Sequence, residues 1–178
     1  ASREVANYVK SLSEKKPIVA WIREVGASGA YWIASSSDVI IADEMSITGS
    51  VGVISSYLEF SGLLERYGVE YERLVAGDLK VVGSPFRDLN DNERNLMNIK
   101  LKKIQDIFIK DVAENRKLDN AQINEIRHGF FYLGVEAKEL GLIDEFGGRE
   151  KAIAKAKELA GIKDGKVVEY KSEKSLLD

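Results

Sequence analysis

Apolar positions along the chain follow two periodicities, which predicts an α/β domain. Over residues 2–13 they recur every three or four positions, as on one face of a helix (Val5, Tyr8, Val9, Leu12). Short runs rich in β-branched residues at 18–22 and 38–42 have the length and composition of buried strands. This order of helices and strands favours the α/β class.

The rest of the chain continues the alternation. A long helix is predicted over residues 90–116, with one apolar stripe (Met97, Leu101, Ile104, Phe108, Val112). Gly68 is a suitable residue to end a helix at 58–67. Further helices are expected at 30–35, 119–127, 134–140 and 149–160. Strands are expected at 69–75 and 167–170, an irregular loop at 76–88, and a frayed charged tail after 170.

Length and composition indicate one soluble domain over residues 1–178, large enough to be a catalytic domain. Apolar residues make up 44% of the chain and charged residues 31%, with a net charge of −3. Because the charges are mixed in sign throughout, nothing resembles a nucleic-acid-binding face. The absence of cysteine and the single histidine exclude disulfides, cysteine zinc sites and clusters of histidine ligands. No apolar run reaches the roughly 18 residues that a membrane span needs.

A serine flanked by small residues follows the strand at 18–22, in Gly-Ala-Ser-Gly-Ala at 26–30. Small neighbours allow a substrate backbone to approach Ser28, and free N–H groups at a following helix, such as that of Gly29, suit a developing oxyanion. The fifth position departs from the G-x-S-x-G elbow. The alternative is an ordinary helix start packed on the sheet, with Ser28 as its N-cap.

A serine nucleophile needs a base, and the sequence offers two candidates. His128 follows a predicted helix. The alternative to a catalytic role is a surface histidine that stabilises the C-terminus of this helix. Lys80 is flanked by Leu79, Val81 and Val82, so desolvation would lower its pKa toward neutrality. An exposed loop lysine is the alternative.

A second serine, Ser50, lies in a tight glycine turn, Thr-Gly-Ser-Val-Gly at 48–52. Its hydroxyl could hydrogen-bond the amine of Lys80 and orient it. An ordinary turn serine that bonds its own backbone is the alternative.

Four blocks in order resemble the signal peptide peptidase A (SppA) family. They are G-A-S-G-A-Y (26–31), T-G-S-V-G-V (48–53), A-G-D-L-K-V-V-G-S-P-F-R-D-L (76–89) and E-A-K-E-L-G-L-I-D-E-F-G-G (136–148). The resemblance spans about residues 18–148. It implies a ClpP/crotonase-like fold of repeated strand-strand-helix units. It also implies a Ser-Lys dyad, with Ser28 as nucleophile, Lys80 as base, Ser50 orienting the base and Gly29 donating to the oxyanion.

The same resemblance implies substrates and surroundings. Expected are extended peptides, chiefly cleaved signal peptides, a homo-oligomeric ring or dome, and active sites on the extracytoplasmic side of a membrane. No cofactor or metal is expected. The family's S-P-G-G stretch, which supplies a second oxyanion donor, is not in the sequence. We therefore expect an upstream portion that carries a first strand, that turn and a membrane anchor.

Two other functions fit the same fold. A crotonase-type acyl-CoA hydratase or isomerase would use carboxylates and a backbone oxyanion hole, but it leaves the serine at position 28 unexplained. A non-catalytic, membrane-associated scaffold would have kept the fold alone. Covalent labelling of Ser28 by a serine-reactive probe separates both from a peptidase.

Overall fold

The computed structural model describes residues 1–170 and has the α/β class that the sequence predicts. The helices are α1 (Ser2–Ser13), α2 (Gly29–Ala34), α3 (Ser61–Arg66), α4 (Asp91–Arg116), α5 (Asn120–Ile126), α6 (Gly134–Glu139) and α7 (Arg149–Ala160). The strands are β1 (Val19–Ile22), β2 (Val25–Ala27), β3 (Val39–Ala42), β4 (Ile47–Gly49), β5 (Phe131–Leu133) and β6 (Glu145–Phe146). None of the helices in this part of the chain is long and apolar enough to cross a membrane.

The strands form two small sheets. One is parallel, in the order β1-β3-β6, and the other has the order β2-β4-β5, in which β2 and β4 are parallel and β5 is antiparallel. The first two units, β1-β2-α2 and β3-β4-α3, have the expected strand-strand-helix order. The C-terminal part departs from this order, because β5 is followed by α6 and β6 by α7, with one strand before each helix.

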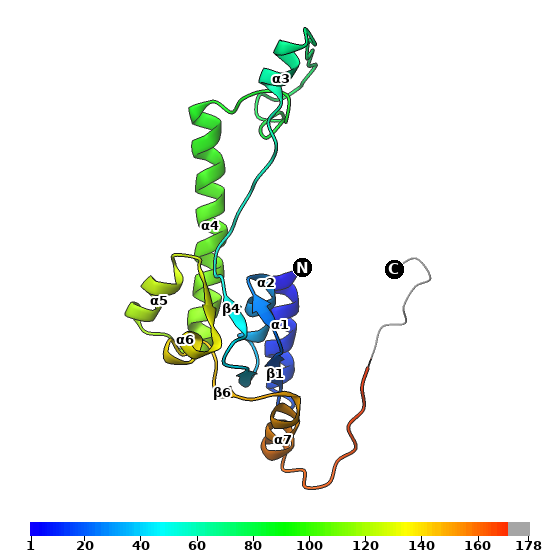
Figure 1. The fold of residues 1–178 in the computed structure, drawn as a ribbon, viewed down its shortest axis with the longest axis vertical. Coiled ribbons are helices and arrows are strands. Elements are labelled where there is room, and N and C mark those ends of the chain that lie inside the picture. The colour runs from blue at the N-terminus through cyan, green and yellow to red at the C-terminus, as the bar shows by residue number, and fades with distance from the viewer. Residues whose placement is uncertain (171–178) are drawn as a thin grey trace.

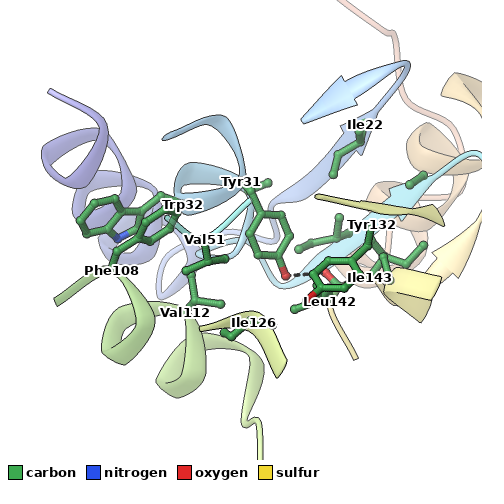
Figure 2. Close-up of a cluster of buried hydrophobic side chains, with 14 of the residues drawn as sticks. Ile22, Tyr31, Trp32, Val51, Phe108, Val112, Ile126, Tyr132, Leu142 and Ile143 are labelled. Carbon is green, nitrogen blue, oxygen red and sulfur yellow. Dashed lines mark hydrogen bonds between the residues drawn. The ribbon is translucent and has the colours of Figure 1, made fainter. Parts of the chain in front are cut away.

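The buried core joins α2, the C-terminal half of α4 and both sheets (Figure 2). Trp32 of α2 stacks on Phe108 of α4 with ring centroids 4.2 Å apart. Tyr31 is fully buried, and its hydroxyl donates to the carbonyl of Leu142 at 2.8 Å (Figure 2). Burial raises the pKa of Tyr31, so this hydroxyl keeps its proton and its hydrogen bond. The core therefore fixes α2 directly behind Ser28.

Beyond this core, α4 extends away from the sheets and carries a projecting segment (Figure 1). We call residues 54–89 the arm; it includes α3 and lies at the N-terminal end of α4 (Figure 1). The predicted stripe of α4 is buried only at Phe108 and Val112, whereas Ile104 is 46% exposed. The apolar stripe therefore continues past the core of this chain.

Several predicted elements differ from the structure. Helix α1 forms where expected but buries Ala6, leaving Val5 and Tyr8 exposed, because a small residue permits close packing on α2. The expected strand at 69–75 is wrong: this segment is exposed and pairs with no strand among residues 1–170. Residues 167–170 likewise form no strand. The predicted frayed tail lies outside the described residues.

Candidate active site

Ser28 lies at the sharp turn between β2 and α2, in a backbone conformation unusual for a residue with a side chain. Its φ and ψ are 54° and −126°. Few non-glycine residues have positive φ, and such outliers cluster at functional sites. The turn is held by the Ser28 N–H, which donates to the Gly49 carbonyl at 2.8 Å, and by the Ser28 carbonyl, which accepts from Trp32 at 2.9 Å.

The side chain of Ser28 is exposed, although the residue occupies the N-cap position of α2. Its hydroxyl makes no capping hydrogen bond. The ordinary helix-cap role that the sequence left open is therefore not the role of this hydroxyl. A strained strand-to-helix turn that presents a free hydroxyl is the arrangement of a nucleophile elbow.

Position 29 leaves little room for a side chain at this turn. A Cβ built on it would lie 2.5 Å from the Oγ of Ser2, at the start of α1. Within residues 1–170, its N–H has no hydrogen-bond partner and is therefore available as a donor. The predicted oxyanion role of Gly29 is compatible with this arrangement and stays a prediction.

The structure brings the Ser50 turn next to the Ser28 turn. In the parallel pair of β2 and β4, Ala27 is opposite Gly49, so the two serines follow at the same end of the sheet. Ser50 also has positive φ, 51°, and its N–H donates to the carbonyl of Phe130 at 2.9 Å. Buried Thr48 donates its hydroxyl to the Gly26 carbonyl at 2.9 Å, which adds a second link between the two turns.

The loop that contains His128 borders the same region. Gly129 contacts Gly52 backbone to backbone, and a Cβ on Gly52 would lie 3.2 Å from the Cα of Gly129. His128 itself is exposed, and in the described part of the chain its side chain forms no hydrogen bond. The histidine thus lies closer in the fold to the Ser50 turn than sequence reasoning indicated.

Lys80, in contrast, lies on the arm and is not brought to Ser28 within this chain. It is exposed, and its neighbour Leu79 is 56% exposed, so the desolvation expected from the sequence is absent here. The physical reason is that no arm residue belongs to the buried core of residues 1–170. The arm lies at the far end of α4 from the sheets (Figure 1).

A cleft of about 510 Å³ lies beside the Ser28 turn. Gly26 and Ala30, two residues before and after Ser28, line it together with Trp21, Ile22 and Val25. Strand β1 forms one wall and pairs only with β3 among the described residues. An unpaired strand edge offers backbone N–H and C=O groups to an extended peptide. No group of acidic or histidine side chains suited to a metal ion occurs in residues 1–170.

Comparisons with known proteins fit this geometry. Residues 10–163 match the model of peptidase family S49. A "Putative protease" of Methanocaldococcus jannaschii is 36% identical over 170 residues, which cover 96% of this chain and 55% of that protein. A "Putative signal peptide peptidase SppA" of Enterococcus faecium is 35% identical, covering 96% and 51%. The chain spans about half the length of these relatives.

Among solved structures, an enoyl-CoA hydratase/isomerase from Marinobacter aquaeolei aligns with a TM-score of 0.46 and 15% identity. The alignment covers 86% of this chain and 41% of that one. The assignment does not depend on this likeness, since the family model matches most of the sequence. The chain belongs to peptidase family S49.

Proposed function

We propose that the protein is a serine peptidase in which Ser28 is the nucleophile and Lys80 the general base. The observation that carries the proposal is the strained Ser28 turn with its exposed, uncapped hydroxyl, in a chain of a peptidase family. Small residues on both sides and the adjoining cleft leave room for a peptide backbone. The crotonase alternative gives no reason for such a turn.

The proposed reaction is acyl transfer in two steps. Neutral Lys80 accepts the Ser28 proton while Oγ bonds to the peptide carbonyl carbon, and the N–H of Gly29 stabilises the oxyanion. The C–N bond then breaks as Lys80 passes the proton to the leaving amine. Water attacks the ester with Lys80 again as base, which releases a carboxylic acid and restores Ser28. Ser50 orients the amine of Lys80.

This mechanism requires the arm to reach Ser28. Either the arm of the same chain folds toward the sheets, or the arm of a neighbouring copy supplies Lys80. The second route agrees with the homo-oligomer expected from the resemblance, and the exposed apolar arm residues favour it. Mixing full-length Ser28→Ala with full-length Lys80→Ala protein separates the two routes. Activity regained on mixing supports a shared site, and no recovery supports a site within one chain.

The proposed substrates are extended peptides, chiefly cleaved signal peptides at the extracytoplasmic side of a membrane. The resemblance in four sequence blocks and the name of the E. faecium relative support this class. The free edge of β1 beside the cleft suits an extended backbone better than a folded domain. A membrane anchor outside the present sequence belongs to the same proposal.

Covalent labelling tests the nucleophile directly. A fluorophosphonate probe should label the full-length protein at Ser28, and Ser28→Ala should remove the label. Ser50→Ala is the matched control, because it removes the same group from the neighbouring turn and should leave the labelled residue unchanged. Labelling that persists in Ser28→Ala would refute the assignment.

His128 remains the alternative base, because its loop contacts the Ser50 turn in the structure. The proposal requires His128→Ala to retain its activity and Lys80→Ala to lose it. The opposite result would replace the Ser-Lys dyad by a Ser-His pair while keeping Ser28 as nucleophile.

A further inference from the structure

The junction between the arm and α4 contains a two-pronged ion pair. Arg87, near the end of the arm, donates from Nη2 to Oε1 of Glu93 at 2.6 Å and from Nη1 to Oε2 at 2.9 Å. Paired N–H groups facing both oxygens of a carboxylate fix direction as well as distance. The geometry therefore constrains the angle at which the arm leaves the helix.

Glu93 is built into the first turn of α4. It is 5% exposed, and its carboxylate also accepts the N–H of Asn90 at 3.1 Å, while Asn90 Oδ1 accepts the N–H of Glu93. Hydrogen bonding from Arg87 lowers the pKa of Glu93, so the carboxylate stays charged despite its burial. Glu93 is thus the fixed end of the junction.

Arg87 belongs to the arm side. The Nη1 group donates to the carbonyl of Asp88 at 2.8 Å, and the adjoining Phe86 packs on Tyr71 with ring centroids 5.2 Å apart. Within residues 1–170, all side-chain hydrogen bonds from the arm to the rest of the chain go from Arg87 to Glu93. Most other arm residues are exposed, Leu74 to 93%, whereas residues 81–85 are half-buried.

We propose that the Arg87–Glu93 pair is a positioning joint that sets the direction of the arm and thereby where Lys80 is delivered. The inference rests on the proposed function, since it assigns the joint a role in bringing the base to Ser28. Neither residue touches the reacting atoms. Both act through the arm. This holds whether the arm reaches Ser28 of the same chain or of a neighbouring copy.

The first test is kinetic and uses the full-length protein. Glu93→Gln, which keeps the shape but removes the charge, should lower kcat about tenfold to a hundredfold, the effect of misplacing a catalytic group by about 1 Å. Arg87→Lys keeps the charge but loses the fork, so its loss should be smaller. Asp106→Asn is the matched control, because it removes another ion pair of α4, the exposed one with Arg127 at the end of α5, and should leave kcat unchanged.

The second test measures the position of the arm relative to α4. It distinguishes a displaced arm from an unfolded protein. Because the chain has no cysteine, spin labels can be attached at Asp78→Cys on the arm and Lys103→Cys on α4. With labelled protein diluted in unlabelled protein, double electron–electron resonance should give a narrow distribution of distances between the two labels. Glu93→Gln should broaden or shift it, at a temperature where circular dichroism shows native helix content, and Asp106→Asn should not.

The inference is overturned if Glu93→Gln leaves the distance distribution or kcat unchanged while Lys80→Ala is inactive. Full activity of Lys80→Ala would instead overturn the proposed base, and the catalytic part of the inference with it. The two failures are thus distinguished by one variant.

Discussion

The strain at Ser28 predicts that glycine is more stable than alanine at this position. A residue with a Cβ at φ 54° and ψ −126° lies outside the allowed regions, at a cost on the order of 1–3 kcal/mol. Glycine removes that cost but loses about 0.4–1 kcal/mol through the greater entropy of its unfolded chain. The Ser28 hydroxyl is exposed and caps nothing, so its own loss changes little.

The expected difference is that Ser28→Gly unfolds with a free energy about 0.5–2 kcal/mol above that of Ser28→Ala. In a domain of this size each kcal/mol shifts the melting temperature by roughly 2–4 °C. Denaturant titration followed by circular dichroism measures the difference. Ser55, exposed and not at positive φ, is the control, where alanine should exceed glycine. If alanine matches or exceeds glycine at position 28 as well, the turn stores no strain and the argument for a nucleophile elbow fails.

Three further variants test the site, and a fourth tests the packing of the fold. Lys80→Arg should be as inactive as Lys80→Ala in a peptidase assay over a range of pH, because arginine keeps its proton; substantial activity would remove Lys80 as base. His128→Ala should keep its rate, and a drop of about a hundredfold, typical of a lost general base, would reverse that choice. Ser50→Ala should slow turnover about tenfold to a hundredfold through one lost hydrogen bond; an unchanged rate would leave Ser50 a simple turn residue. Gly134→Ala should destabilise the fold by at least about 1–3 kcal/mol in thermal melts, since its Cβ would lie 2.0 Å from the Asp43 carbonyl oxygen; a neutral result would contradict this packing.

Local signals predicted much of the fold. Helix α4 starts where expected because Asn90 and Glu93 form a capping box, and Gly68 takes the positive φ expected of a residue that ends a helix. The strand expected at 69–75 failed for a non-local reason. Its composition suits a strand, but a strand also needs a partner, and this segment lies on the arm.

The candidate site was predictable only in part, in its local turns. The small residues around Ser28 indicated a sharp turn, and its neighbour in the structure is the Ser50 turn, as the motif order suggested. The exposure of Lys80 could not be predicted, because apolar neighbours in sequence do not reveal whether anything packs on them. The Arg87–Glu93 pair was missed too. A signal existed in the capping box at Glu93, but nothing in the sequence connects that residue to Arg87.

The pairing of β4 with β5 also bears on when the site can form during synthesis. The Ser50 N–H obtains its partner from the Phe130 carbonyl, and β4 pairs with β5 residues that follow the arm and two helices in the chain. Such distant contacts close late, because the loop between them must first lose its entropy. A ribosome releases the N-terminal part first. A nascent chain therefore exposes Ser28 well before the Ser50 turn is complete, and the proposed site can form only with the last third of the domain.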